Sequence, residues 1–124
     1  MRALIVDDSR AIRGILKRSL TECGFNDFVE AGDGQEALAM LASGPLPEAA
    51  FVDWNMPVMN GLEFVQAVRA DDIYDAMAVV MVTSETAIEQ VEAALEAGAD
   101  EYVMKPFTAE ILEEKLALVR MNRG

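Results

Sequence analysis

The fold is decided by residues 49–57, which read AAFVDWNMP. The apolar residues at 49–52 predict a short buried strand. It ends on a carboxylate, Asp53, and Asn55 and Pro57 then favour a loop. A carboxylate at the end of a buried strand costs free energy unless another group pairs with it. The sequence must therefore supply partners for Asp53 from elsewhere in the chain.

Other short apolar runs also end in polar residues. They are 4–6 before Asp7 and Asp8, 79–82 before Thr83, and 101–104 before Lys105. The carboxyl ends of parallel strands lie at one edge of a sheet, and ligands of open α/β sheets bind just outside that edge. Three carboxylates, a hydroxyl and an ammonium group are therefore expected to converge on one place.

Strand-like and helix-like segments alternate along the chain. Strands are predicted at 3–6, 28–31, 49–52, 78–83 and 101–104, and a helix follows each of them. This alternation predicts an α/β fold, in which a parallel sheet is covered by helices on both faces. Right-handed crossover connections leave few possible topologies.

Apolar residues at helical spacing predict the buried face of each helix. They are Ile12, Ile15, Leu16 and Leu20 in the first helix, Ala37, Leu38 and Leu41 in the second, Leu62, Val65 and Val68 in the third, Ile88, Val91 and Leu95 in the fourth, and Leu112, Leu116 and Val119 in the fifth. Capping signals precede three of the helices, namely Ser9 for the first, a capping box of Thr86 and Glu89 for the fourth, and Thr108 for the fifth.

Length and charge narrow the class of protein. A chain of 124 residues suits one domain, residues 1–124, without an output domain. Its formal charge of −12 disfavours a nucleic-acid partner, because phosphate backbones are negative. No apolar run reaches the roughly 18 residues of a membrane span. The single cysteine, Cys23, fits a reducing cytoplasm and leaves no pair for a disulfide.

With these residues placed, the chain resembles the receiver domain of bacterial two-component response regulators, and in particular the stand-alone chemotaxis response regulators. The resemblance covers essentially the whole length. It rests on four motifs in this order, Asp7-Asp8 and the segments 53–57, 81–85 and 102–107. Many members have aspartate where this chain has Asn60, in a loop turn. The resemblance implies a flavodoxin-like doubly wound (βα)5 fold with strand order 2-1-3-4-5.

A Mg²⁺ site is expected at this edge. The carboxylates of Asp7, Asp8 and Asp53 are hard oxygen ligands, which Mg²⁺ prefers. The resemblance implies that the backbone carbonyl of Asn55 is a further ligand. It also implies that Asp53 is the phosphoacceptor, and a carboxylate nucleophile is a recognised route to an acyl phosphate.

The remaining site residues are predicted to neutralise the charge of the phosphoryl group and to change conformation after phosphorylation. Lys105 supplies a compact positive charge for phosphoryl transfer. The resemblance implies a cis peptide bond between Lys105 and Pro106. Thr83 offers a hydroxyl to a phosphoryl oxygen. After phosphorylation Thr83 is expected to shift and Tyr102 to rotate inward. This would alter the face formed by the fourth helix, the fifth strand and the fifth helix.

The function that the resemblance implies is phosphorylation-activated signalling. A sensor histidine kinase or a histidine phosphotransfer protein would phosphorylate Asp53. The phosphorylated receiver would then bind a downstream protein. Such a receiver catalyses only its own phosphorylation and dephosphorylation. The resemblance is compatible with three roles for such a receiver: it could control a motor switch, relay the phosphoryl group onward, or act as a phosphate sink.

Two other classes of protein share features with this sequence. A Mg²⁺-dependent aspartyl-phosphate phosphatase acting on an external substrate typically has a second acid where this chain has Asn55. A flavodoxin-like cofactor binder can share the fold, because fold alone does not fix function. The acidic cluster disfavours the anionic phosphate of a flavin.

Overall fold

The computed structural model describes residues 1–84 and 88–123, and this part of the chain has the predicted α/β fold. One parallel sheet has the order β2-β1-β3-β4-β5, as expected. Its strands are β1 (Arg2–Val6), β2 (Asp27–Ala31), β3 (Ala49–Val52), β4 (Ala78–Thr83) and β5 (Glu101–Met104). The helices are α1 (Arg10–Glu22), α2 (Gly34–Ser43), α3 (Gly61–Arg69), α4 (Ile88–Ala97) and α5 (Ala109–Arg123), and a short 3₁₀ helix, η1 (Asp72–Tyr74), precedes β4.

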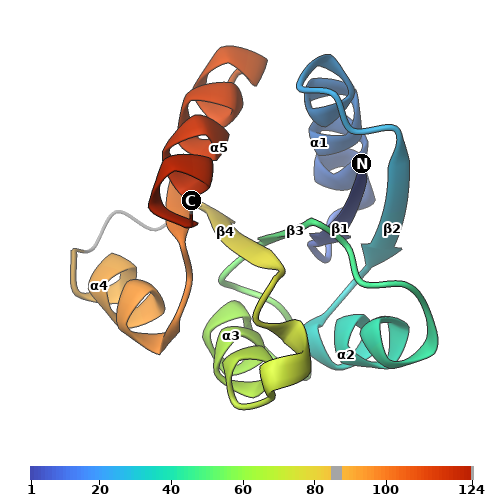
Figure 1. Cartoon of the computed structure of the whole chain (residues 1–124), viewed down its shortest axis with the longest axis vertical. Helices are drawn as coiled ribbons and strands as arrows, with labels where there is room; N and C mark the ends of the chain where they lie inside the picture. The colour runs from blue at the N-terminus through green and yellow to red at the C-terminus, as the bar shows by residue number, and fades with distance from the viewer. Residues whose placement is uncertain (85–87, 124) are drawn as a thin grey trace.

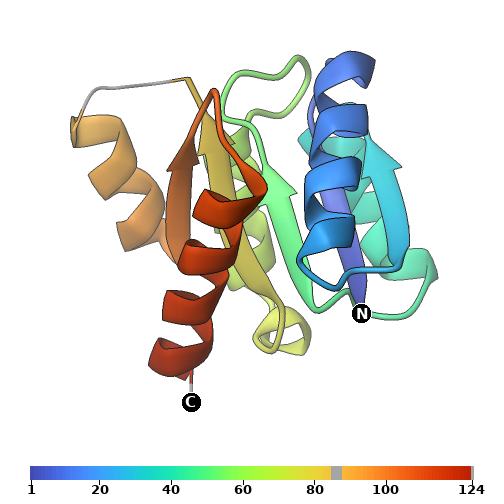
Figure 2. The same cartoon turned by 90° about the horizontal axis from the view of Figure 1, so that it is seen from above.

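Helices cover both faces of the sheet (Figure 1). On one face, strand residues such as Ile5 and Phe51 pack against α1 and α5. On the other face, Val6 and Val52 pack against residues of α2 and α3. The central strands β1, β3 and β4 are buried on both sides and read as nearly unbroken apolar runs, whereas the edge strands β2 and β5 are only partly buried. All strands are parallel (Figure 2), so the polar residues that follow them lie at one edge.

Helix caps explain several of the boundaries. The hydroxyl of Ser9 accepts a hydrogen bond from the backbone N–H of Ile12, and Thr108 does the same for Ile111. Helix α3 begins with a reciprocal capping box between Asn60 and Glu63, which the sequence analysis did not identify. Thr86, which the sequence predicts to form a capping box with Glu89, lies outside the described residues.

Some predicted inward faces are wrong. Ile88 is 72% exposed and Leu95 39% exposed, and Val91 is half-buried. Helix α4 instead buries Ala94. A small residue lets the helix backbone approach the core closely, and the larger side chains then point outward. The buried face of α4 is therefore rotated away from the predicted stripe, toward Ala94.

Two smaller errors concern α1 and α3. Ile15 is 40% exposed, because α1 buries the narrower stripe of Leu16 and Leu20 against the sheet. Leu62 is half-buried, and the fully buried aromatic ring beside it belongs to Phe64, which the predicted face omitted. The predicted faces of α2 and α5 pack as expected, with Ala37, Leu41, Leu112, Leu116 and Val119 buried.

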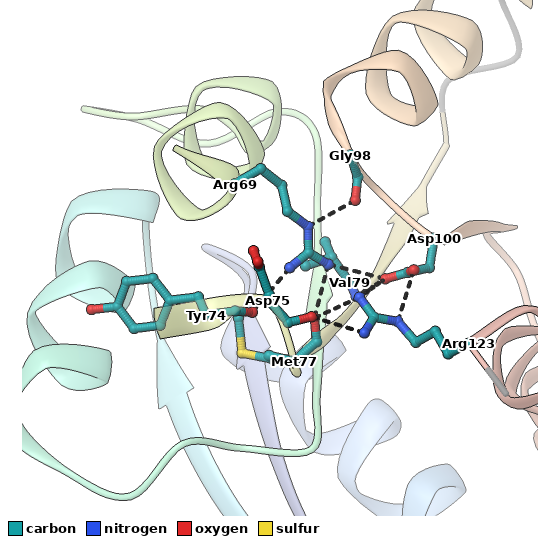
Figure 3. A network of polar contacts seen from close by, with 8 residues as sticks. All are labelled: Arg69, Tyr74, Asp75, Met77, Val79, Gly98, Asp100 and Arg123. Carbon is teal, nitrogen blue, oxygen red and sulfur yellow. Dashed lines mark hydrogen bonds and ion pairs between the residues drawn. The ribbon is translucent and has the colours of Figure 1, made fainter. Parts of the chain in front are cut away.

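A polar network ties the opposite edge of the sheet together (Figure 3). Arg69 of α3 and Arg123 of α5 both pair with Asp100, just before β5. Asp100 also accepts the N–H of Val79 at 2.8 Å. The other guanidinium donors bond main-chain carbonyl oxygens, those of Tyr74, Asp75, Met77 and Gly98. This network fixes the C-terminal ends of α3 and α5. None of its residues lies at the edge of the sheet where Asp7, Asp53 and Lys105 follow their strands.

No helix among residues 1–84 and 88–123 combines the length and the apolar character needed to cross a bilayer.

Candidate functional site

The strands place three charged side chains at one edge of the sheet. Asp7, Asp53 and Lys105 each directly follow a strand, and each extends the strand ladder by one backbone hydrogen bond. Their N–H groups donate to the carbonyls of Ala31 at 3.0 Å, Val6 at 2.9 Å and Thr83 at 2.9 Å, respectively. The positions of these side chains therefore follow directly from the pairing of the sheet.

Three carboxylates form a cluster here. One oxygen from each of Asp7, Asp8 and Asp53 lies within 4.8 Å of the others. Asp7 is 1% exposed and Asp53 is 8% exposed, whereas Asp8 lies at the surface. Hard oxygen donors with one open side match the needs of Mg²⁺, which keeps several waters and takes few protein ligands. The donor set thus fits that ion, with Asp8 on the side that faces solvent.

Lys105 joins the two buried carboxylates. Its Nζ lies 3.0 Å from Asp7 Oδ2 and 3.4 Å from Asp53 Oδ1. The Lys105–Pro106 peptide bond is cis. The other carboxylate oxygen of Asp7 accepts the backbone N–H of Ser9 at 2.8 Å. The ammonium group thus pairs with two of the three carboxylates, so the cluster keeps an excess of negative charge.

The environment of Asp53 makes its charge costly. Burial raises the pKa of its carboxyl; Lys105 opposes this rise and Asp7 adds to it, and the pKa lies above its ordinary value. The N–H of Trp54 donates to Asp53 Oδ1 at 2.9 Å and orients the group. A divalent cation or a phosphoryl group with its counter-charge would change this balance. Burial and its charged neighbours thus set the charge state of Asp53.

The other predicted site residues lie around this cluster. Thr83 is buried at the end of β4, and its carbonyl positions the backbone of Lys105. Asn55 lies in the loop after Asp53 with its side chain exposed. Tyr102 is half-buried on β5, and Lys115 Nζ lies 4.4 Å from the centroid of its ring. The structure thus brings Asp7, Asp8, Asp53 and Lys105 together. Tyr102 lies on β5 beside Lys115 and is not part of this cluster.

One residue of structural importance to the site was missed. Gly61 begins α3, and its N–H donates to the carbonyl of Trp54 at 2.9 Å. A Cβ at this position would overlap the carbonyl oxygen of Asp53 and lie 2.8 Å from Met81 Cε. The sequence marks Gly61 as part of a turn, but only the fold reveals that its hydrogen leaves room for Asp53.

The loop between β3 and α3 holds a strained residue. Val58 has a φ of 66° and is 74% exposed. The N–H of Met59 donates to the carbonyl of Pro57 at 2.7 Å, which makes a γ-turn centred on Val58. A positive central φ gives the rarer and more strained form of this turn, and a β-branched residue is poorly suited to it.

We expect Val58→Asn to raise the free energy of unfolding by about 1 kcal/mol, because asparagine tolerates positive φ values. Thermal and urea unfolding measure this. Ile73→Asn is the matched control, since Ile73 is 68% exposed and has no positive φ. It should change stability by less than about 0.5 kcal/mol. An equal change in both variants would show that the loss of an exposed apolar side chain, rather than relief of strain, is responsible.

Comparison with known proteins extends this description. Residues 3–117 match the response regulator receiver domain. A chemotaxis protein CheY homolog from Campylobacter jejuni is 46% identical over 116 residues, which cover 94% of this chain and 89% of that protein. The chemotaxis response regulator CheY4 of Vibrio cholerae has a TM-score of 0.84 at 38% identity, over 95% of this chain and 97% of that one. A chain of the CheX-CheY-BeF3-Mg²⁺ complex from Borrelia burgdorferi has a TM-score of 0.89 at 26% identity, over 97% and 89% of the two chains.

Proposed function

The chain belongs to the response regulator receiver domain family, and on this premise we propose that it is a phosphorylation-controlled signalling receiver whose phosphoacceptor is Asp53. The observation that carries the proposal is the pairing of a buried carboxylate, Asp53, with Lys105 Nζ at 3.4 Å inside a three-carboxylate cluster. This pairing supports the proposal, because it sets a carboxylate that could act as the nucleophile beside a positive charge that could meet the transferred group.

Mg²⁺ would be held by Asp7, Asp8, Asp53 and the backbone carbonyl of Asn55. When bound, it supplies positive charge to the phosphoryl oxygens. A carboxylate oxygen of Asp53 attacks phosphorus while the bond from phosphorus to the donor's histidine nitrogen breaks. That nitrogen keeps the electron pair of the broken bond. Phosphoryl transfer depends mainly on such positioning and charge neutralisation, and the protein contributes little covalent chemistry beyond the nucleophile.

Two groups of the chain would meet the transferred phosphoryl group. Lys105 directs its ammonium to one oxygen, and the Thr83 hydroxyl donates to another. Thr83 and Tyr102 occupy neighbouring strands, β4 and β5, so a shift of Thr83 toward the phosphoryl group would reach Tyr102 through the sheet. The altered face of α4, β5 and α5 would then bind a downstream protein.

The partners follow from the same premise. The phosphoryl donor is a sensor histidine kinase or a histidine phosphotransfer protein, and the names of the relatives favour chemotaxis as the pathway. The Borrelia burgdorferi structure is of a complex of CheX, CheY, BeF3 and Mg²⁺. By analogy, the phosphorylated form of this chain is the one that binds its target. The chain is a receiver domain that catalyses only its own phosphorylation and dephosphorylation.

Incubation with acetyl phosphate and Mg²⁺ tests this function. We expect intact-mass spectrometry to find one added phosphoryl group, and peptide mapping to place it on Asp53. Rapid release of phosphate over many turnovers without labelling would favour the phosphatase alternative. If Mg²⁺ binds but the protein shows neither labelling nor turnover, the proposal is contradicted.

We expect Lys105→Met to leave Mg²⁺ affinity unchanged or slightly tighter, because it removes a positive charge 3.0 Å from Asp7. Phosphoryl uptake should slow on the order of a hundredfold, since the phosphoryl oxygens lose a charged donor. The fluorescence of Trp54, which adjoins Asp53, reports Mg²⁺ binding. Labelling by acetyl phosphate reports uptake.

Lys115→Met is the control for Mg²⁺ affinity, because Lys115 pairs with Glu101 and not with the cluster. It should bind Mg²⁺ and take up phosphate as the wild type does. Weak Mg²⁺ binding together with normal uptake in Lys105→Met would contradict the role given to Lys105.

A further inference from the structure

Arg13 links three parts of the molecule beside the acidic cluster. It belongs to α1, and its Nη1 donates to the main-chain carbonyl of Asp7 at 2.6 Å. Its Nε donates to Glu30 of β2 at 3.1 Å. The Arg13 side chain is 17% exposed, so these bonds form largely away from water. A charged donor that is partly buried makes a stronger hydrogen bond than a neutral one.

Glu30 anchors this arginine. It accepts from Arg13 and also pairs with Lys17 Nζ at 3.2 Å. Burial raises the pKa of Glu30. The interactions with Lys17 and Arg13 together lower it by more than burial raises it, so the pKa lies below its ordinary value. Glu30 pairs with Ile5 in the sheet register, so its position is fixed by the β1–β2 ladder. Arg13 is therefore held at one end by the sheet, and it holds Asp7 at the other.

The carbonyl that Arg13 holds is part of the peptide joining Asp7 to Asp8. The other polar atoms of Asp7 are also engaged, by Ala31, Ser9 and Lys105. Asp8 differs, because within the described part of the chain its side chain makes no hydrogen bond or ion pair. The direction of the Asp8 side chain thus depends on the orientation of the peptide before it.

We infer that Arg13 is a positioning residue for the metal site, because its bond to the Asp7 carbonyl fixes the peptide that aims the Asp8 carboxylate at the other two. The inference rests on the proposed Mg²⁺-dependent function. Partners in the outer shell of a metal site that orient its ligands commonly change metal affinity by about 10- to 100-fold when they are removed.

Electrostatics and positioning predict opposite signs for this residue. Arg13 is a cation near the cluster, so its positive charge alone repels Mg²⁺, and removing it should tighten binding. If its bond to Asp7 matters, removing it should weaken binding. Lys17 provides the comparison, because it carries the same charge, lies on the same helix and pairs with the same Glu30. Within residues 1–84 and 88–123, the Lys17 ammonium bonds Glu30 and makes no bond to Asp7.

The test measures Mg²⁺ affinity by calorimetry for the wild type, Arg13→Met and Lys17→Met. Methionine keeps most of the aliphatic stem and removes the charge. We expect the dissociation constant to rise about tenfold in Arg13→Met, and to stay equal or fall slightly in Lys17→Met. Equal or tighter binding by Arg13→Met, with cooperative unfolding retained, would overturn the inference. A wild type that binds no Mg²⁺ would instead count against the proposed function.

A second measurement does not depend on the metal. In the metal-free protein, the carbonyl carbon NMR signal of Asp7 should move upfield in Arg13→Met and remain in place in Lys17→Met. Arg13→Lys keeps the charge and one donor, so it should restore much of the affinity if it reaches the Asp7 carbonyl. An unmoved Asp7 signal in Arg13→Met would also overturn the inference, even where the variant is less stable.

Discussion

Asp53→Asn should take up no phosphoryl group from acetyl phosphate, at any Mg²⁺ concentration. The amide lacks the negative oxygen that attacks phosphorus, and it is a weaker ligand for a hard cation. We expect neither of the other carboxylates of the cluster to substitute for it. Asp7 is 1% exposed with both of its oxygens bonded, and Asp8 lies at the solvent side. Intact-mass spectrometry after incubation provides the measurement.

The same variant should fold well, which separates loss of chemistry from loss of structure. Burial raises the pKa of Asp53 above its ordinary value, with Lys105 opposing and Asp7 adding to the effect. The folded wild type therefore holds this proton more tightly than the unfolded chain does. Its stability should fall as the pH rises from the ordinary carboxyl range through the raised pKa. Metal-free Asp53→Asn should lack this loss and be at least as stable at neutral pH.

Glu63→Gln is the matched control for Asp53→Asn. Glu63 is an exposed carboxylate of α3 whose capping role glutamine can keep. This variant should be labelled as the wild type is. Labelling of Asp53→Asn at the wild-type level would reject Asp53 as the phosphoacceptor, and a collapse of its unfolding transition would show that the carboxylate is needed for folding.

Much of the fold could be predicted because apolar runs, and the polar residues that end them, are local signals, whereas the order of the strands came from the family resemblance. Four apolar runs stop at polar residues, and in a parallel sheet those stops must meet at one edge. The convergence of Asp7, Asp53 and Lys105 follows from that rule once the alternation of strands with helices has indicated a parallel sheet. The inner face of α5 was also readable, since Leu112, Leu116 and Val119 recur at helical spacing and are buried.

The errors arise where tertiary packing decides. In α4 the apolar residues Ile88 and Leu95 suggested an inner stripe, but the helix approaches the core through Ala94. Hydrophobic spacing cannot distinguish a small contact residue from an exposed apolar neighbour. The role of Arg13 was equally hidden, because its partner Glu30 is 17 residues away and on another element. A basic residue on a helix predicts solvent exposure in the absence of that partner.

Gly61→Ala should have the largest effect on the fold among the substitutions near the site. A Cβ there would overlap the carbonyl oxygen of Asp53 and press on Met81 Cε at 2.8 Å. The Asp53 backbone cannot move away cheaply, because its N–H is bonded to Val6 in the sheet. Overpacking of this kind typically costs about 1–3 kcal/mol of unfolding free energy. Since the displaced atoms carry the Asp53 carboxylate, Mg²⁺ affinity and phosphoryl uptake should fall as well.

Gly14→Ala is the control for Gly61→Ala, because no heavy atom lies within 4 Å of a Cβ added to this helical glycine. Alanine there should stabilise the protein by roughly 0.5–1 kcal/mol through helix propensity, and leave Mg²⁺ binding unchanged. If close approach is the reason for Gly61, urea unfolding should show stability changes of opposite sign in the two variants. Mg²⁺ titration should show weaker binding in Gly61→Ala and unchanged binding in Gly14→Ala. If Gly61→Ala proved as stable as the wild type and took up phosphate normally, the loop would have to yield at Met59 or Asn60. The carboxylate of Asp53 would then be held by the sheet alone.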